Sequence, residues 1–536
     1  MGEAYLLDCT LRDGGYINDW NFGRSTLLNV FSRLVRSGVD LIEVGFLDER
    51  RPFDENRSIA PDTASFGRIF GNVDKGGATV LGMIDYGTCG IDRLQPCRES
   101  YLDGIRVIFK KHIRREAIAF CHQVKALGYK VFVQAVSITS YDDDELLDLV
   151  ALVNGLRPFA LSMVDTYGLL HKSGLMHILE RFNEHLDPAI AIGYHAHNNF
   201  QLGYANSIEV LGAPVRRNLV VDATLYGMGK SAGNTPLELI TMYMNANLGK
   251  RYDVSQMLEA IDTNLMPIYH ETPWGYNLFF YLSGSNQCHP SYVAYLLSKH
   301  TLSIRAINEI LSQLEGEEKL LYNQKRIEQL YLRYQRNDCD DTAGLAQLRA
   351  ELGGKDILLL GPGRSIDERK DRVHAYLRAH PSAVVAINFL PAGFEGDAQY
   401  LFLTNNKRYS QLATALSELP KDIRLIAMSN VMELQSPFHC VLNYSSWIDP
   451  DTEIPDNSLV MALRILSAVG ARSIALAGFD GYQKDRMNYY LTNMEYGFVR
   501  EKADYLNHYI RGWVRRLGET VPLTFVTPSV YQEGEA

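Results

Sequence analysis

Arg12 and Asp13 are the first residues along the chain whose types point to chemistry. They stand beside Gly14 and Gly15, directly after the apolar run Leu6–Thr10. The run predicts a short buried strand, and the glycines allow positive φ and close approach of the backbone to another group. Charged side chains are poor core material unless they are paired. The stretch is therefore either a surface ion pair on a tight turn or a site at the mouth of a strand.

Two further stretches offer groups that could bind a metal ion. His195 and His197 are two residues apart at the end of a predicted strand, so strand alternation puts both imidazoles on the same side. Neutral imidazole is a good ligand for divalent metals. Asn234 lies in the glycine-rich stretch LYGMGKSAGNTPLE. The alternatives are two core or solvated histidines and a flexible loop.

The elements that would position these residues are short apolar runs separated by helical stretches. Eight such runs occur in the first 225 residues: Tyr5–Cys9, Asp40–Phe46, Ala78–Ile84, Ile105–Phe109, Lys130–Ile138, Phe159–Val164, Ile190–His195 and Leu219–Thr224. Leu27–Ser37 and Arg115–Leu127 between them have apolar residues at helical spacing. Eight alternating units of this size predict a closed (β/α)₈ barrel. An open doubly wound sheet is the alternative, which the lack of an early G-x-G-x-x-G disfavours.

A closed barrel would bring the three stretches together. Strand eight lies between strands seven and one in such a barrel, and the carboxyl ends of all strands meet at one rim. Asp13, His195, His197 and Asn234 would there offer two oxygens and two nitrogens. This donor set suits Mn²⁺, Mg²⁺, Co²⁺ or Zn²⁺ and leaves coordination positions open for a substrate. The sequence thus predicts a divalent metal site at the barrel rim.

Composition and charge exclude several classes of protein. Lys and Arg total 53 against 63 Asp and Glu, a net charge of −10, and no dense basic stripe occurs, so we expect no nucleic-acid partner. No apolar run is long enough to span a membrane, and the N-terminus does not read as a signal peptide. The seven cysteines contain no C-x-x-C pair, which indicates free thiols. We therefore expect a cytoplasmic protein.

The 536 residues are too many for one core and predict an α/β chain of three parts. Residues 1–254 form the (β/α)₈ TIM barrel. Residues 255–354 lose the strand signal and form a helical extension and linker, which caps the barrel, mediates oligomerisation or bridges to the next unit. A new strand–turn–helix pattern at 355–536 predicts a Rossmann-like α/β domain. We expect the protein to form a homo-oligomer.

Five motifs in fixed order resemble the metal-dependent aldolase and lyase barrels, the superfamily of 3-hydroxy-3-methylglutaryl-CoA lyase, isopropylmalate synthase and 4-hydroxy-2-oxovalerate aldolase. They are DCTLRDGG, IEVGF, VDTYG, HAHNN and GMGKSAGN, and the resemblance covers roughly residues 5–300. The residues after the barrel look closer to the oxovalerate aldolase branch. The resemblance implies that Asp13, His195 and His197 bind the metal, and that Asn234 matches a ligand found in part of the family.

The resemblance also assigns the substrate-facing residues. Arg12 would stabilise the enolate oxygen, Glu43 would orient Arg12, and Thr166 would lie near the substrate carboxylate. A guanidinium suits the enolate role because its planar fork stays charged and can hold two oxygens. Tyr16 stands where the aldolases carry a candidate acid/base histidine. A phenol is a poor base at neutral pH, so Tyr16 would protonate or position the substrate instead.

These observations predict a divalent-metal-dependent aldolase or retro-aldolase. It would form or cleave a C–C bond next to a 2-keto acid of the pyruvate type, with an aldehyde or sugar as the second substrate. One alternative is a Claisen-type acyltransferase that condenses an acyl-CoA with a keto acid. The other is a barrel that keeps its metal as a scaffold without catalysis.

The C-terminal domain carries a weaker signal. DILLLGPGRS could cradle a phosphate on Gly361, Gly363 and Ser365 at the start of a helix, and Asp480 follows the strand Ser473–Ala477 at a switch-point position. This domain loosely resembles sialyltransferase-like surface-glycan proteins, which implies a nucleotide-sugar partner and a role in bacterial surface polysaccharide biosynthesis. The alternative is a degenerate Rossmann-like domain used for docking.

Overall fold

The computed structural model describes most of the chain. The described residues are 2–300, 302–319, 321–335, 339–404, 406–416, 419–431, 438–449, 452–492 and 495–532. They divide into two compact units, Met1–Pro290 and Ser291–Ala536.

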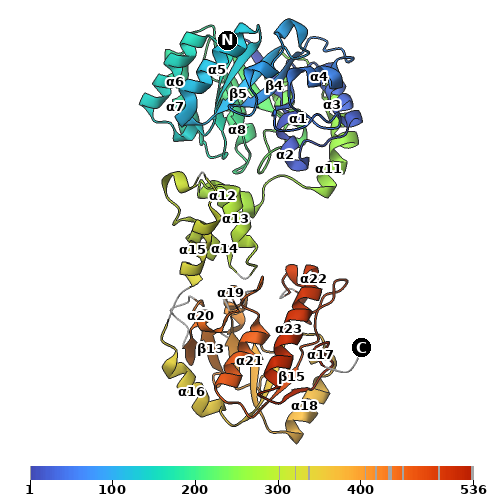
Figure 1. Ribbon diagram of the computed structural model, residues 1–536, viewed down its shortest axis with the longest axis vertical. Helices are drawn as coiled ribbons and strands as arrows, with labels where there is room; N and C mark the ends of the chain where they lie inside the picture. Colours follow the sequence, from blue (N-terminus) through green and yellow to red (C-terminus); the bar gives the residue numbers. More distant parts are fainter. Residues whose placement is uncertain are drawn as a thin grey trace. The chain divides into compact units, whose positions relative to one another are not determined.

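The first unit is a closed barrel of eight parallel strands (Figure 1, blue to green). The strands are β1 (Ala4–Asp8), β2 (Leu41–Leu47), β4 (Thr79–Asp85), β5 (Gly104–Phe109), β6 (Lys130–Ala135), β7 (Ala160–Asp165), β8 (Ala191–Ala196) and β9 (Leu219–Ala223). Pairing of β1 with β2, Leu7 opposite Leu41, closes the ring. The predicted barrel is therefore confirmed, and the open-sheet alternative is wrong. A two-residue strand β3 (Ile59–Ala60), which the sequence did not predict, is appended to β2.

Helices surround the barrel and cover apolar strands that are buried along almost their whole length. They are α3 (Arg24–Ser37), α4 (Thr63–Phe70), α5 (Arg114–Ala126), α6 (Asp143–Leu156), α7 (Lys172–His185), α8 (Gly203–Leu211) and α9 (Leu237–Asn247). Two short helices, α1 (Thr10–Asp13) and α2 (Gly15–Asn18), follow β1 at the rim. All seven residues of β2 are buried, as expected for a parallel strand covered on both faces.

The strand that carries the two histidines is held tightly on both sides. A Cβ added to Gly193 of β8 would lie 2.1 Å from Ser162 Oγ of β7, so only glycine fits at this close approach. The buried Arg217 donates hydrogen bonds to four carbonyl oxygens, that of Asn183 in the last turn of α7 and those of Leu186, Asp187 and Ile190 between α7 and β8. These contacts fix the start of β8 and thereby the height of its histidines at the rim.

Helices fill the region between the two sheets in sequence. They are α10 (Val254–Ala260), α11 (Met266–Glu271), α12 (Leu278–Ser285), α13 (Pro290–Leu297), α14 (Ile304–Leu311), α15 (Gln324–Gln335) and α16 (Thr342–Leu352). The loss of strand signal after the barrel thus corresponds to helices, while the boundaries proposed at 254/255 and 354/355 stay a prediction. Within the described part of the chain, every helix is too short or too polar to cross a lipid bilayer.

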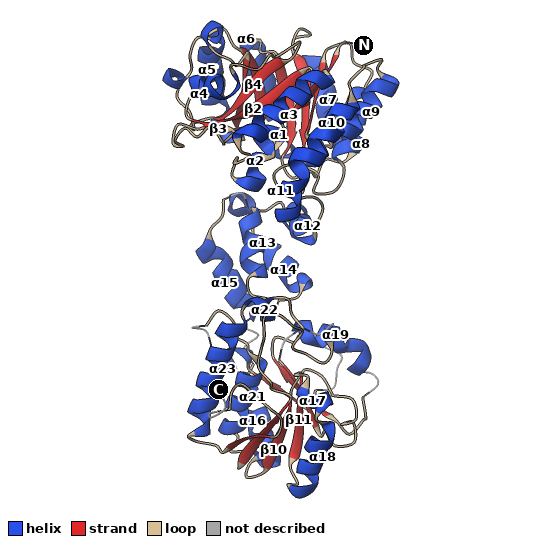
Figure 2. Cartoon of the chain, turned by 90° about the vertical axis from the view of Figure 1, so that its right-hand side faces the viewer, coloured by secondary structure: helices blue, strands red, loops and turns tan. Residues whose placement is uncertain are grey.

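The second unit contains a seven-stranded parallel sheet (Figure 2, lower red strands). Its order is β14-β13-β12-β11-β10-β15-β16, with β10 (Asp356–Leu360), β11 (Ala383–Ile387), β12 (Tyr400–Leu403), β13 (Arg424–Met428), β14 (Cys440–Leu442), β15 (Ser473–Ala477) and β16 (Leu523–Phe525). The described helices around it are α17 (Ser365–Glu368), α18 (Lys370–Ala379), α19 (Asn406–Leu416), α20 (Tyr444–Trp447), α21 (Ser458–Ala468), α22 (Phe498–Glu501) and α23 (Ala503–Gly518). The predicted Rossmann-like α/β architecture is confirmed. The three-residue β14 was not predicted.

Replacing Arg217 with methionine should lower the free energy of unfolding by about 3 kcal/mol, because buried carbonyl oxygens would lose their donors. Urea unfolding followed by circular dichroism measures the change. Arg36, exposed on α3, is the matched control, and its methionine variant should stay within about 0.5 kcal/mol of wild type. Equal effects of the two substitutions would contradict the role assigned to Arg217.

Candidate metal and active site

Asp13 lies at the end of α1, directly after β1, and is almost completely buried. Its Oδ1 accepts a hydrogen bond from the backbone N–H of Lys230 at 2.8 Å. Its Oδ2 forms an ion pair with Nη1 of Arg12 and lies 3.6 Å from Nε2 of His195. The opening turn therefore holds a buried carboxylate that faces β8, so the surface ion-pair interpretation is wrong.

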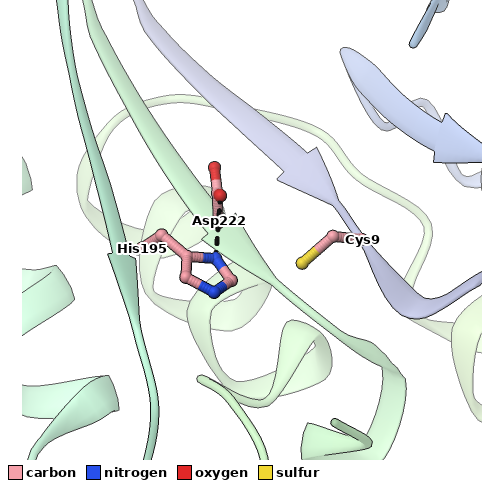
Figure 3. Close-up of side chains that lie close together, drawn as sticks. All are labelled: Cys9, His195 and Asp222. Carbon is pink, nitrogen blue, oxygen red and sulfur yellow. Dashed lines mark hydrogen bonds and ion pairs between the residues drawn. The ribbon is translucent and has the colours of Figure 1, made fainter. Parts of the chain in front are cut away.

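His195 is oriented by a second carboxylate. Its Nδ1 lies 2.9 Å from Oδ2 of Asp222, which comes from the neighbouring strand β9 (Figure 3). A hydrogen bond at Nδ1 places the proton there and leaves Nε2 as the metal-binding nitrogen. That nitrogen is the one that approaches Asp13.

Asp13, His195 and His197 together fit a metal ion. Their potential ligand atoms all lie within 4.8 Å of one another, and all three residues are buried. Asn234 pairs with His197 through an isolated backbone bridge. Among the described residues, neither Nδ1 of His197 nor Oδ1 of Asn234 has a hydrogen-bond partner, although both atoms are buried. Buried polar atoms without partners are rare and indicate a bound ion or water, so the donor set suits a metal ion.

The loop that carries Asn234 approaches Asp13 closely enough to need glycine. A Cβ on Gly229 would lie 2.0 Å from Nδ2 of Asn234 and 2.7 Å from Oδ1 of Asp13. Any larger residue at this position would displace both polar groups. The glycine-rich loop is thus packed against the site and is more than a flexible connection.

The protonation states also suit metal binding. Burial lowers the pKa of His197 to about 4, so its imidazole is neutral and can donate a lone pair at physiological pH. Burial alone would raise the pKa of Asp13, but the charges of Arg12, His197 and His195 outweigh it and hold the pKa well below its usual range. Asp13 is therefore ionised when the histidine is neutral.

Cys9, His195 and Asp222 form a second group with metal-ligand spacing (Figure 3). Cys9 points its sulfur toward the imidazole, but burial raises the pKa of the thiol well above its usual value. Only a thiolate is a good metal ligand. Asp222 is already bound to Arg106 and to Nδ1 of His195. The Asp13 group is therefore the better metal site, and both groups share His195.

A buried ion network supports Arg12 from inside the barrel. Glu43 accepts from Nε of Arg12 at 2.7 Å and from Nη1 of Arg106 at 3.0 Å. Arg106 also donates to Asp222 and to Gln134. With Asp13, the network holds two guanidinium groups and three carboxylates, so a nearby cation would offset the excess negative charge.

Sequence reasoning identified Glu43 in this network but missed Arg106 and Asp222. The signal was present in the apolar strands GIRVIF and LVVDA, each of which contains one charged residue. A charge in the middle of a buried strand is costly without a partner. Which charge pairs with which depends on strand order, which only the closed barrel supplies.

Tyr16 and Thr166 also lie at the carboxyl end of the barrel. Tyr16, on α2, is 40% exposed, and its ring lies 5.2 Å from Nζ of Lys230. Burial of the hydroxyl raises the pKa of Tyr16 to about 12, so the phenol is neutral. Thr166 follows β7, and its Oγ1 accepts a hydrogen bond from the N–H of Ser137 at 2.8 Å. Their roles toward a substrate stay predictions.

The four residues predicted in the C-terminal domain come together, but around a carboxylate. Oδ2 of Asp480 accepts from the N–H of Ser365 at 2.8 Å, and Oδ1 accepts from its hydroxyl. A Cβ on Gly361 would lie 2.5 Å from Phe479, and one on Gly363 would lie 2.6 Å from Asp480. The glycines thus allow the turns after β10 and β15 to pack closely, and Asp480 occupies the donors expected for a phosphate.

Comparison with known proteins shows what the barrel is similar to. Residues 3–264 match the model of the HMGL-like family. The match confirms the resemblance that the five motifs predicted. The 4-hydroxy-2-oxovalerate aldolase of Marinomonas sp. is 22% identical over 280 residues, which cover 50% of this chain and 79% of that protein. The enzyme of the same name from Pelotomaculum thermopropionicum is 26% identical over 264 residues, 48% of this chain and 75% of that protein.

Condensing enzymes match as well. The 2-isopropylmalate synthase of Methanocaldococcus jannaschii is 24% identical over 275 residues, 48% of this chain and 50% of that protein. The chain thus spans about half the length of this synthase. Among solved structures, the HMG-CoA lyase of Brucella melitensis is 15% identical and covers 48% of this chain and 96% of its own, with a TM-score of 0.40.

Asp222→Asn should weaken binding of Mn²⁺ by about 10- to 100-fold, because the amide no longer fixes His195 in the metal-binding tautomer. Isothermal titration calorimetry on the full-length protein measures the affinity. Asp8→Asn, a buried substitution of the same type on β1, is the control and should change the affinity less than threefold. Equal affinities of Asp222→Asn and wild type would remove Asp222 from the site.

Asp8 itself predicts a pH-dependent stability. Burial raises the pKa of Asp8 to about 7, against an unfolded value of 3.8. The folded state therefore holds a proton that the unfolded state releases, and this contribution to stability is lost as pH rises from about 4 to 7. Asp8→Asn should be more stable than wild type by ~2 kcal/mol at pH 8 and similar to it near pH 4. Urea unfolding of both proteins with a chelator present, measured at pH 4 and at pH 8, tests whether the stability difference grows with pH in this direction.

Proposed function

We propose that this protein is a divalent-metal-dependent aldolase or retro-aldolase that forms or cleaves a C–C bond next to a 2-keto acid of the pyruvate type. The observation that carries the proposal is the buried set of Asp13, His195 and His197 directly beside Arg12. The HMGL-like match and the relatives named 4-hydroxy-2-oxovalerate aldolase support the reaction class.

Asp13, His195 and His197, with Asn234 as a fourth ligand, would hold Mn²⁺, Mg²⁺, Co²⁺ or Zn²⁺. When bound, such an ion would polarise the keto and carboxylate oxygens of a chelating 2-keto acid and so favour the enolate. The mixed nitrogen and oxygen donors and the neutral His197 suit each of these ions.

Arg12 is proposed to stabilise the negative charge that develops on the keto oxygen. Glu43 and Asp13 engage Nε and Nη1 of its guanidinium, which leaves Nη2 to donate to a substrate oxygen. The two carboxylates also raise the pKa of Arg12 against the opposing effect of burial, so its charge is fixed. A donor held in place before the reaction pays little reorganisation when charge develops.

Tyr16 is proposed to supply or position a proton at the outer end of the site. Its neutral phenol can donate a hydrogen bond to the oxygen of an aldehyde, and its raised pKa keeps the phenol protonated, so it cannot serve as a base at neutral pH. Thr166 is proposed to contact the carboxylate of the keto acid through its hydroxyl, which can donate while Oγ1 accepts from Ser137.

A second candidate is a Claisen-type condensation of an acyl-CoA with a keto acid, which the isopropylmalate synthase relatives favour. Both reactions pass through a charge on a carbonyl oxygen, so Arg12 and the metal would serve either. Release of free CoA, detected with a thiol reagent, identifies the condensation, and release of pyruvate identifies the retro-aldol cleavage. A metal-retaining scaffold would give neither product.

The biological setting stays a prediction. A sugar or aldehyde as the second substrate, a nucleotide-sugar at residues 355–536 and a role in bacterial surface polysaccharide biosynthesis rest on the resemblance of the C-terminal domain. The family match ends at residue 264, and the relatives described above each align with about half of the chain. A homo-oligomer and a cytoplasmic location likewise stay predictions.

Arg12→Lys should retain Mn²⁺ yet exchange the methyl protons of pyruvate with D₂O about 100-fold more slowly, because a point charge replaces the held guanidinium. The full-length protein is incubated with Mn²⁺ and pyruvate in D₂O, and samples are quenched and freed of Mn²⁺ before proton NMR measures the remaining methyl protons. Arg114→Lys, on the outer helix α5, is the matched control and should exchange at the wild-type rate.

Loss of exchange in His197→Ala together with loss of Mn²⁺ binding would complete the case for the site. If the Arg12→Lys variant exchanged at the wild-type rate, another residue would have to stabilise the enolate. Absence of exchange in the wild-type protein with each of the four metals would overturn the proposal itself.

A further inference from the structure

The C-terminal domain contains a cavity at the switch point of its sheet. The chain runs from β10 outward through β11 to β14 and then returns to β15 on the other side of β10. The loops that follow β10 and β15 therefore diverge, and ligands of open α/β sheets bind at such points. A cavity of about 90 Å³, which opens to solvent, lies there and is lined by residues after β10, β11 and β15, among them Gly363, Asn388 and Asp480.

Aromatic rings form much of the cavity wall. The lining includes Phe389, Phe479, Tyr482, Tyr489, Tyr496, Phe498 and Tyr531. Flat aromatic surfaces stack on planar rings and on the apolar faces of sugars, and most of these side chains come from loops.

One buried cation reaches this wall. Arg408, on α19, lines the cavity and is only 5% exposed. Its guanidinium carbon lies 3.9 Å from the ring centre of Tyr496 and 5.8 Å from that of Tyr489. The stacked rings hold the planar guanidinium in one orientation, as recognition of a carboxylate or phosphate requires.

The start of α21 adds a second feature that favours negative charge. Asn457, Ser458 and Leu459 line the cavity at the N-terminus of this 11-residue helix. The side chain of Asn457 caps the helix by accepting a hydrogen bond from the N–H of Val460. The N-terminal end of a helix carries a partial positive charge, and this end lies in the cavity wall. Arg408 and the helix end favour an anionic group here, while the buried carboxylate of Asp456 also lines this part of the cavity.

The wall between these features is rigidly built. Asn388 has φ of +62°, which is uncommon for a residue other than glycine. Its Nδ2 donates to Ser458 at 2.8 Å, and its Oδ1 accepts from the N–H and the hydroxyl of Thr404. Strained residues held by buried hydrogen bonds occur preferentially at ligand sites.

We propose that this cavity binds a ligand of the nucleotide class, with the planar base against the tyrosines and the phosphate at Arg408 and the start of α21. The turn at Gly361 and Gly363 is not the phosphate site, because Asp480 already accepts from Ser365 there and would repel an anion. The site is independent of the barrel chemistry.

Calorimetry of the full-length protein against AMP, CMP, GMP and UMP, with the four nucleosides and inorganic phosphate as comparison, tests the proposal. At least one nucleotide should bind at least tenfold more tightly than its nucleoside. Arg408→Met should weaken the nucleotide about tenfold or more and leave the nucleoside unchanged, because only the phosphate loses its partner. Arg472→Met, beside the amino end of β15 and paired with Asp356, is the matched control and should bind as wild type.

Hydrogen exchange of the wild-type protein locates the ligand without any substitution. The bound nucleotide should protect amides in 388–389, 457–459 and 478–482. Failure of all four nucleotides to bind at millimolar concentration, protection confined to residues 3–264, or full affinity in a folded Arg408→Met variant would each overturn the proposal. Pyruvate exchange measured in Arg408→Met should equal wild type, so the outcome is separate from that of the barrel reaction.

Discussion

The chain of buried ion pairs across the barrel interior is the interaction on which the candidate active site depends. Glu43 binds both Arg12 and Arg106, and Arg106 binds Asp222, which in turn orients His195. Four of these residues lie on β2, β5, β8 and β9, and Arg12 lies in the turn that follows β1. A buried charge is tolerated only with its partners in place, so the network forms only when the barrel closes in this one strand order. Closure of the fold and alignment of the metal ligands are therefore the same event.

The network also explains how one small volume can hold groups with opposite requirements. Arg12 keeps Asp13 ionised, while burial keeps His197 neutral and Tyr16 protonated. A metal ligand set needs the first two states, and a proton donor needs the third. No residue has to change its charge before a substrate arrives, and such preorganisation lowers the free energy of a developing oxyanion.

Much of this arrangement could be predicted from sequence because local patterns specify it. Alternation of strands and helices predicts the barrel, and the rule that the carboxyl ends of the strands share a rim predicts that Asp13 lies near His195. The pairing of Arg106 with Asp222 could not be predicted, since 116 residues separate them and their contact depends on barrel closure. The three-residue strand β14 was missed because so short a run carries no periodic signal.

The C-terminal turn shows how a correct pattern can have a different cause. The glycines after β10 matched a phosphate loop, yet the structure uses them for close packing against Phe479 and Asp480. Phosphate binding and close packing both select glycine, because each requires a backbone position without a Cβ atom. The distinction lies in which group accepts from Ser365, and that acceptor follows another strand, 115 residues away.

Strand order then decides where each sheet can hold a ligand. In the barrel, β1 pairs with β2 as well as β9, so every strand has two neighbours and the loops converge on one enclosed rim. In the second sheet, β10 has β11 on one side and β15 on the other while the edges stay open, so the loops diverge at a single crevice. Repeated β/α units of similar composition therefore give a central candidate metal site in one unit and an off-centre cavity in the other. The polar groups differ accordingly. Buried carboxylates and imidazoles lie at the barrel rim, where the loops converge, and an arginine among tyrosines lies at the crevice of the second sheet, where the loops diverge.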